Sequence, residues 1–569
     1  YDGPLVTDVA TAGLPGGAHA VHFAYDDGDE MALSSIGVDA EAPIVRTYDN
    51  DGILTSAGAL TLTPDADSGL LNDATAGLVN TTYARNGYGE PSLETHSWAG
   101  AGGSGTLGFT YGYDRESRLT QRVETLGVVT ETLDYIHDAR GRLVDVFVDS
   151  GAAATYHYDY DENDNRIGWN TPAGACVPTV ALPCVDIDAQ DRLLRHDDIT
   201  FVYNDRGQRI SRSQPGGGGT LTTTYEYDEV GNLWRVVLPD TTVVSYRVDG
   251  LGRRVARFVD GVADAYWLYQ DGLNPVAQLD GAGNVTQQYV YATRLNVPDL
   301  IIEGGVTYRV LTDQVGSVRR VVDTATGATV LEREYSPYGA LEFSNGSFGQ
   351  PFGYAGGLED SLTGLVRFGA RDYDPEVGRW TAKDPILTSG GVNLYEYGAS
   401  APQMFVDPNG RFVILAAIGI AALTNGVING YIEYSTGNGS FLGGLGRGIV
   451  GGTVGAVASI AAIALGPAGA AAIGGATSNA ITTTLNEIFG NAGFNSRSPL
   501  KIVVSTACGA AFGGAGGYGA NGVVNQASPL LGKAGDDAAA IVEALIGNMF
   551  GSGVSAPGPA GVDLTYELL

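Results

Sequence analysis

Residues 227–233 read Tyr-Asp-Glu-Val-Gly-Asn-Leu, and this short motif recurs along the chain in recognisable copies. Asp and Gly accept the backbone angles of a tight turn, and the residues on both sides of the motif alternate between apolar and polar types. Each copy therefore predicts one β-hairpin. The clearest other copies begin at Tyr48, Tyr113, Tyr135, Tyr158, Tyr203 and Tyr246.

The spacing of these copies is close to regular. They recur roughly every 22 residues, which is typical of a repeat protein. In the series from Tyr113 to Tyr246 the one wide gap, between Tyr158 and Tyr203, contains a degenerate copy at Asp188–Leu193, and Tyr48 begins an earlier copy. A single hairpin of about 20 residues cannot bury its own apolar face, so neighbouring hairpins must stack edge to edge. The sequence thus predicts a mainly β chain, built as a long, curling antiparallel sheet.

The composition agrees with this fold class and restricts the partners. The chain has 84 glycines, and its 30 tyrosines outnumber its 16 phenylalanines, a mixture that favours short strands joined by turns. The formal net charge is -32, and residues 1–410 carry almost all of it. Because an acidic surface repels phosphate, the charge disfavours nucleic acid as a partner of residues 1–410.

A denser set of motifs replaces the repeat after about Tyr308. Three Asp-Pro pairs stand out in it, and each is a common turn sequence. The motifs are Thr312–Val318, Tyr335–Gly339, Pro351–Gly357, Thr363–Pro375, Gly378–Trp380, Lys383–Ile386, Asn393–Tyr397 and Asp407–Gly410.

Together the repeats and these motifs resemble the RHS/YD-repeat family with its RHS repeat-associated core, which includes bacterial polymorphic toxins. The resemblance implies a spiral β shell of stacked antiparallel hairpins around a hollow interior, similar to the shells of teneurins and of Tc-toxin C subunits. We expect residues 1–307 to form the YD-repeat shell and residues 308–411 the core. Residues 412–569 would then form a variable, Gly/Ala-rich, hydrophobic and partly helical C-terminal region.

In this family the core resembles an aspartic protease that acts on its own chain. Carried over motif by motif, the catalytic residues are Arg371, Asp384 and Asp407, and the cleaved bond joins Arg411 to Phe412. Two carboxyls a few Å apart cannot both ionise easily, so one can give a proton while the other accepts one. The alternative interpretation is that the two Asp residues only shape turns.

Two positions depart from the family pattern. Arg411 stands where the family often has Leu, and Ala401 precedes Pro402 where the family usually has Asn. These changes bear on the efficiency of self-cleavage and not on the fold.

The C-terminal region leaves three hypotheses open. Residues 412–423 are apolar but too few to span a bilayer, whereas residues 448–486 and 502–532 carry no charge and are long enough. Glycines spaced by four residues occur in both of these stretches, as they do in membrane helix pairs. The region is therefore a membrane-active segment, a cargo held in the shell, or a linker to a missing effector.

No further enzyme activity, cofactor or metal site is predicted. Cys508 lies in an apolar run and resembles a small buried hydrophobe more than a nucleophile. His19 and His22 have a spacing suited to a metal but lack further ligands. The C-terminal region contains no histidine, which excludes histidine-dependent nucleases there. The histidines of the chain are His19, His22, His96, His137, His157 and His196.

Two other pairs of residues carry smaller predictions. Cys176 and Cys184 enclose a short loop, and they form either a disulfide in an oxidising compartment or two separate thiols. Arg253 and Arg254 lie in an acidic chain, and we expect both to pair with carboxylates of the repeats.

The leading hypothesis is a secreted or cell-surface scaffold that encloses its own C-terminal segment, severs it, and delivers it to a membrane or target cell. The main alternative is an adhesion module without catalytic activity, whose exposed Trp98, Trp234 and Trp267 stack on surface glycans. A third hypothesis is an inert fragment of a repeat protein. The opening residues, Tyr1–Leu5, resemble the middle of a repeat, so we expect an export signal upstream.

Overall fold

The computed structural model describes residues 6–26, 32–50, 52–66, 68–172, 174–176, 184–387, 391–411 and 413–415. The chain divides into two compact units, Tyr1–Ala456 and Val457–Leu569, and every described residue belongs to the first unit. The predictions for residues 412–569, including the partly helical tail, therefore lie outside the described residues except at 413–415.

Two sheets of sixteen strands each form a wall, and within each sheet every strand pairs antiparallel with the next strand of the chain. The first sheet consists of β1 (Asp8–Leu14), β2 (Gly17–Tyr25), β3 (Leu33–Val38), β4 (Ile44–Tyr48), β5 (Leu54–Ala57), β6 (Leu60–Pro64), β7 (Leu71–Ala76), β8 (Val79–Arg85), β9 (Pro91–Gly100), β10 (Gly103–Tyr113), β11 (Leu119–Leu126), β12 (Val129–His137), β13 (Leu143–Val148), β14 (Tyr156–Tyr160), β15 (Arg166–Thr171) and β16 (Gly174–Cys176).

The second sheet extends from β17 to β32, so it continues past residue 307. It consists of β17 (Val185–Ile187), β18 (Leu193–His196), β19 (Ile199–Tyr203), β20 (Arg209–Gly216), β21 (Gly219–Tyr227), β22 (Leu233–Val237), β23 (Val243–Val248), β24 (Arg254–Val259), β25 (Val262–Tyr269), β26 (Pro275–Leu279), β27 (Val285–Val290), β28 (Leu300–Glu303), β29 (Val306–Thr312), β30 (Val318–Asp323), β31 (Thr329–Tyr335) and β32 (Leu341–Gly346).

The predicted mainly β fold class is confirmed. The described residues form strands, turns and short 3-10 helices such as η1 (Tyr354–Gly356) and η3 (Gly398–Ser400). In this part of the chain, no helix has the length and apolar character that crossing a membrane requires.

The turns of the repeat form as the motif predicts. In the copy that begins at Tyr135, Asp138 accepts the backbone N–H groups of Arg140 and Arg142 at 2.9 and 3.0 Å, and the Arg142 Nε donates to the same carboxylate at 2.7 Å. Arg142 also donates to the Asp164 carboxylate of the next turn at 2.7 Å. Each turn thus closes its own hairpin, and this arginine ties it to the following one.

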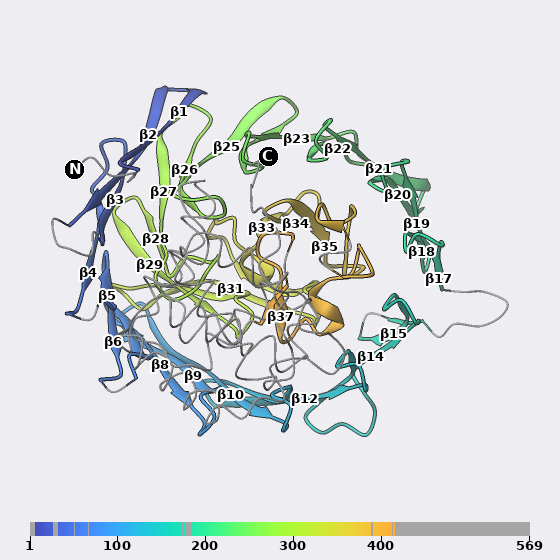
Figure 1. The fold of residues 1–569 in the computed structure, drawn as a ribbon, viewed down its shortest axis with the longest axis horizontal. Coiled ribbons are helices and arrows are strands. Elements are labelled where there is room, and N and C mark those ends of the chain that lie inside the picture. The colour runs from blue at the N-terminus through green and yellow to red at the C-terminus, as the bar shows by residue number, and fades with distance from the viewer. Residues whose placement is uncertain are drawn as a thin grey trace, which may run out of the picture. The chain divides into compact units, whose positions relative to one another are not determined.

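The wall winds past its own beginning. Figure 1 shows the strands following one another round a ring, from β1 in blue to β23 in green, after which β25–β29 lie beside the first strands. Ile44 and Leu60 of the first sheet share a core with Val290 and Leu300 of the second. Leu60 and Leu300 are fully buried, and burial of such a side chain stabilises the fold by about 1.5–3 kcal/mol. Apolar packing therefore helps to hold the second turn of the spiral against the first.

Buried ion pairs also join the two turns of the spiral. Arg294 contacts both carboxylate oxygens of Glu94, at 3.0 and 3.1 Å. Arg319 forms a similar pair with Glu124, at 3.0 and 2.6 Å. Arg319 uses two nitrogens on two oxygens, a contact that fixes geometry as well as charge and so helps to set the register in which the turns meet.

A smaller assembly lies inside the ring of wall strands in Figure 1. Its four-stranded sheet contains β33 (Leu358–Asp360), β34 (Leu365–Phe368), β35 (Arg371–Asp374) and β36 (Arg379–Trp380), and β37 (Phe405–Val406) pairs with β38 (Ile414–Leu415). Its interior is a cluster of aromatic rings, which includes Phe368, Tyr373, Trp380 and Tyr397. We call residues 347–415 the inner core, and it supplies the candidate site.

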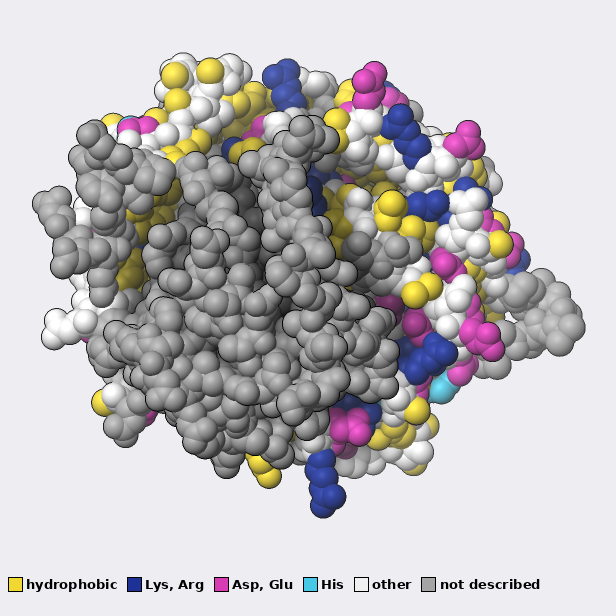
Figure 2. All heavy atoms as spheres, viewed as in Figure 1, with side chains coloured by type: hydrophobic (Ala, Val, Ile, Leu, Met, Phe, Trp, Pro, Cys, Tyr) yellow, Lys and Arg dark blue, Asp and Glu magenta, His cyan; other side chains and the backbone are white. Residues whose placement is uncertain are grey.

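Charged side chains on the wall lie next to their opposites. Figure 2 shows acidic and basic side chains interspersed along the rim at the right of the view, where Figure 1 places β17–β21. Asp188 and Arg192 form one such pair at 2.5 Å. The excess of negative charge is thus partly balanced along this rim by the arginines of the turns.

Candidate active site

The three residues predicted for self-cleavage converge in the inner core. Arg371 is the first residue of β35, Asp384 follows β36, and Asp407 follows β37. The Arg371 Nη2 lies 2.8 Å from the Asp384 Oδ2 and 2.8 Å from the Asp407 Oδ2. The two carboxyls therefore share one guanidinium nitrogen, and their nearest oxygens are separated by at most twice that distance.

Two glycines permit this convergence. The turn between β34 and β35 contains Gly369, and it lies directly against the loop that contains Gly410. A Cβ on Gly369 would lie 2.4 Å from the Asn409 carbonyl oxygen, and a Cβ on Gly410 would lie 2.4 Å from the Phe368 carbonyl oxygen. Both have positive φ angles, +41° and +66°, which L side chains rarely adopt. A hydrogen bond of 2.9 Å from Ala370 N to the Asn409 oxygen closes the contact.

The predicted cleavage site is held in the same loop. Strands β37 and β38 pair as a hairpin, with Val406 opposite Ile414, so Arg411 lies in the connecting loop. The Arg411 backbone N–H donates to the Asp407 Oδ1 at 2.9 Å and to the Asn409 Oδ1 at 3.0 Å. Asp407 thus contacts Arg371 through one oxygen and the cleavage segment through the other. Phe412 lies outside the described residues.

Groups that the sequence did not suggest complete the site. The Leu394 carbonyl oxygen accepts a hydrogen bond from Arg371 Nη1 at 3.3 Å and another from the Asp384 N–H at 3.0 Å. The Arg371 guanidinium also lies 4.1 Å from the centre of the Trp380 ring. The Leu394 carbonyl could not be predicted, because no sequence motif indicates the role of a backbone carbonyl. Trp380 lies in the motif Gly378-Arg379-Trp380 of the sequence analysis, which gave it no role in the site.

Burial sets the electrostatics of the site. Asp407 is fully buried, and Asp384 is 6% exposed. Loss of water around Asp384 raises its pKa, while the charges of Arg371 and Arg411 and the Ile386 N–H act in the opposite direction. Burial likewise lowers the pKa of Arg371, against the pull of the two carboxylates. A raised pKa on one of two neighbouring carboxyls is the direction that general acid–base chemistry requires.

The structure describes the side chain of one cysteine of the predicted pair and both of the closely spaced histidines. Cys184 is disulfide-bonded, but the side chain of Cys176 lies outside the described residues, so their pairing stays a prediction. His19 contacts Asp39 at 2.6 Å, and His22 contacts Asp8 at 2.6 Å. No cluster of three or more metal-ligating side chains occurs within the described residues.

The glycan-stacking prediction is wrong for two of its three tryptophans. Trp98 and Trp267 are 6% and 5% exposed, because each packs into a hydrophobic cluster of the wall. Trp234 is 40% exposed. Trp98 shares its cluster with Leu311 and Val322 of the second sheet, so the second turn of the spiral covers it.

Comparisons with known proteins agree with the fold. The sequence model of the family described as Teneurin YD-shell matches residues 1–403. The chain is 29% identical to mouse Teneurin-3 over 283 residues, which are 48% of this chain and 10% of that protein. It is 27% identical to Double-stranded DNA deaminase toxin A of Burkholderia cenocepacia over 368 residues, 57% of this chain and 24% of that protein.

Among solved structures, the crystal structure of TcdB2-TccC3-Cdc42 is similar with a TM-score of 0.49 and 16% identity, over 69% of this chain and 20% of that one. The chain thus spans about a tenth to a quarter of the length of these relatives.

Proposed function

The chain belongs to the Teneurin YD-shell family, and from that premise we propose that its wall is a scaffold that encloses a C-terminal segment, which the inner core cuts off between Arg411 and Phe412. The division into shell, core and variable C-terminal region, at residues 307 and 411, is part of this proposal. The wall sheet runs on to β32, so the inner core is only the later part of that predicted core. The proposal also includes a secreted or cell-surface location, which a disulfide-bonded Cys184 favours.

One observation carries the cleavage proposal. Arg371 binds both Asp384 and Asp407 through the same nitrogen, and Asp407 also accepts the N–H of Arg411, the residue on the amino side of the cleaved bond. The N–H contact alone is the same contact, four residues along, that shapes the turns of the wall. A pair of turn-shaping aspartates would not need one buried arginine nitrogen shared between them, and this sharing is what favours catalysis. The similarity to a toxin of Burkholderia cenocepacia supports the role of a toxin scaffold.

The chemistry is hydrolysis of one peptide bond. The Asp407 carboxylate takes a proton from a water molecule, whose oxygen attacks the Arg411 carbonyl carbon. The Asp384 carboxylic acid gives its proton to the departing nitrogen of Phe412. The new Arg411 carboxylic acid then passes its proton to Asp384, and Asp407 passes its proton to the Phe412 amine. Both aspartates return to their starting states, and the products are a carboxylate on Arg411 and an ammonium group on Phe412. Holding the bond within the same fold replaces a substrate-binding step, and such positioning can contribute about 7–11 kcal/mol to lowering the barrier.

The test is the mass of the purified chain. We expect two species in place of one of 59.0 kDa, with masses that sum to the whole chain plus one water. N-terminal sequencing of the smaller species should begin at Phe412. A chain that stays whole after prolonged incubation, or a fragment that begins elsewhere, would contradict the proposed cut.

Arg411 offers a pH test of the acid. Its charge lowers the pKa of Asp384, so Arg411→Leu is expected to raise that pKa further. Because Asp384 must be protonated to act as the acid, the fall in cleavage rate on the alkaline side should move to higher pH in this variant. Arg411→Lys keeps the charge and should retain the profile of the unaltered chain. Cleavage rates measured across the pH range decide between these outcomes, and a limb that moves to lower pH would exclude Asp384 as the acid.

A further inference from the structure

Strand β35 presents the candidate site on one face and the wall contacts on the other. On the inner face, Arg371 binds the two carboxyls, and Tyr373 packs in the aromatic cluster and donates its hydroxyl to the Tyr338 carbonyl at 2.7 Å. Since neighbouring residues of a strand point to opposite faces, Asp372 and Asp374 point the other way, toward the wall.

The wall holds this outer face through buried ion pairs. Arg254 of β24 donates to the Asp372 Oδ1 at 2.7 Å, and Arg209 of β20 donates to the Asp374 Oδ2 at 2.6 Å. These residues are separated by 118 and 165 positions in the sequence. Arg254 is 4% exposed and Asp372 2% exposed, so water does not screen their contact.

From this geometry we infer that the wall positions the cutting site, with Arg254 as a positioning residue, so that cleavage waits until the wall has closed around the inner core. The inference rests on the proposed self-cleavage. Contacts between residues so far apart in sequence form only after long loops have closed. Pairing with β34 and β36 forms the small sheet locally, but these distant contacts fix that sheet against the wall. Arg371 therefore reaches its final position only late in folding, and an unfinished wall will keep its C-terminal segment attached.

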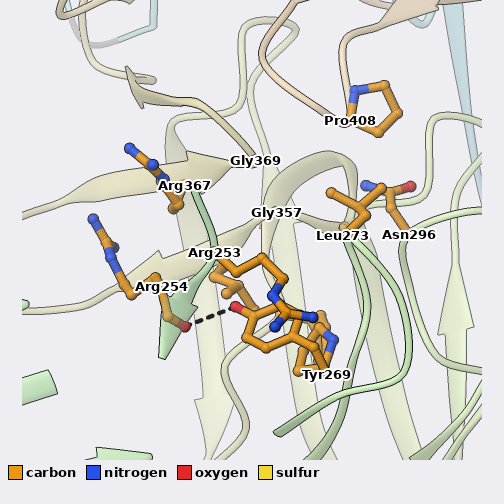
Figure 3. A pocket seen from close by; sticks show the side chains of 14 residues that line it. Arg253, Arg254, Tyr269, Leu273, Asn296, Gly357, Arg367, Gly369 and Pro408 are labelled. Atoms are coloured by element: carbon orange, nitrogen blue, oxygen red, sulfur yellow. Dashed lines mark hydrogen bonds between the residues drawn. The ribbon is translucent and has the colours of Figure 1, made fainter. Parts of the chain in front are cut away.

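Arg254 is itself rigidly held. Its guanidinium lies 3.6 Å from the centre of the Tyr246 ring, and its carbonyl oxygen accepts the Tyr269 hydroxyl at 2.8 Å. Figure 3 shows this hydrogen bond, with the side chains of Arg254 and Arg367 extending to the same side of a pocket that Gly369 and Pro408 also line. The wall strand and the two loops of the candidate site therefore border one space.

A second route connects the wall to Asp384. The Asp372 carbonyl oxygen accepts both the N–H and the hydroxyl of Thr381, each at 3.0 Å. The Thr381 carbonyl oxygen in turn accepts the Arg209 N–H of the wall at 2.9 Å. Thr381 precedes Asp384 by only three residues. The wall strands that carry Arg209 and Arg254 therefore position both Arg371 and Asp384 of the site.

The test replaces Arg254 by methionine in the full chain. Asp372 keeps its second partner, Arg367 at 2.8 Å, so no buried carboxylate is left without a positive charge and the chain should still fold. The chain is made in a cell-free reaction with a radiolabelled amino acid, and loss of the 59.0 kDa band is followed after synthesis stops. Because a misplacement of about 1 Å can cost roughly 100-fold in rate, we expect cleavage to slow about tenfold to a hundredfold.

The matched control is Arg319→Met. Arg319 is 5% exposed, and its partner Glu124 also keeps a second arginine, Arg122 at 3.3 Å. This pair joins two parts of the wall and does not involve β35. We expect the control to cut at the rate of the unaltered chain, although urea midpoints should show a similar loss of stability in both variants.

The pH profile separates positioning from general weakening. A displaced Arg371 would lower the pKa of Asp384 less, so the alkaline limb of the rate should move to higher pH in Arg254→Met and not in Arg319→Met. Arg254→Gln, which can still donate to Asp372, should fall between the methionine variant and the unaltered chain. If the methionine variant does not fold, the cleavage rate and the alkaline limb of the glutamine variant test the inference in its place.

Three results would overturn the inference. The first is that the unaltered chain and the Arg254 variants cut at the same rate and with the same pH profile. This result leaves the proposed function standing. The second is equal slowing of the Arg254 and Arg319 variants in proportion to their stability. The third is an unaltered chain that never cuts, and this removes the proposed function as well.

Discussion

Asp384→Asn and Asp407→Asn chains are each expected to stay whole, as a single species of 59.0 kDa. An amide neither gives nor accepts a proton as a carboxyl does, and general acid–base catalysis contributes about 10²–10⁴-fold. Each change keeps the volume of the side chain and leaves Arg371 with one carboxylate partner, so the fold should persist. Intact-mass measurement after prolonged incubation checks the result.

The control for these variants is Glu124→Gln. Glu124 is another buried carboxylate held by arginines, Arg319 at 2.6 Å and Arg122 at 3.3 Å, but it lies within the wall. This variant should cut as the unaltered chain does. If an Asp384→Asn or Asp407→Asn chain still splits between Arg411 and Phe412 at the unaltered rate, the replaced residue is not a catalyst and the turn-shaping interpretation holds for it.

Arg371→Met is expected to abolish cleavage and to lower the free energy of unfolding by about 3–5 kcal/mol. The change leaves two buried carboxyls, Asp384 and Asp407, close together without the charge that balances them. It also leaves the Leu394 carbonyl oxygen without one of its two donors. Urea denaturation of the Arg371→Met chain gives its stability. The reference is the Asp384→Asn chain, because it is also expected to stay whole, whereas the unaltered chain would be a mixture of two cut pieces.

A double variant tests the physical reason for this loss. Adding Asp384→Asn to Arg371→Met removes one of the two stranded carboxyls, so the pair of changes should cost less than the sum of the single ones. Losses that simply add would show that the guanidinium stabilises the site by packing on Trp380, 4.1 Å away, more than by balancing charge.

The local structure of the wall could be predicted from the sequence because the forces that create it act within one repeat. Asp138, Arg140 and Arg142 lie within five positions of one another, and their hydrogen bonds close the turn without help from elsewhere. The degenerate copy also forms, since Asp188 and Arg192 make the same contact. The candidate site could be predicted only through the resemblance of its Asp-Pro motifs to a family.

The partners of particular side chains could not be predicted in this way. Arg253 pairs with Asp249 of its own turn, at 2.7 Å, as expected. The expectation for Arg254 was wrong, because this neighbour pairs with Asp372 of the inner core and not with a repeat carboxylate. Adjacent residues of a strand point to opposite faces, and the sequence does not say what each face will meet. The buried Trp98 and Trp267 were misjudged for the same reason.

The sequence by itself determined the hairpins, their antiparallel order and the chemical types available for cleavage, because a tight turn and a period of two are properties of neighbouring residues. Only the tertiary structure decided that the spiral packs on its own beginning and that Arg371, Asp384 and Asp407 meet at one nitrogen. Those contacts join residues dozens to hundreds of positions apart. Their energy depends on burial and close approach, which no local pattern encodes.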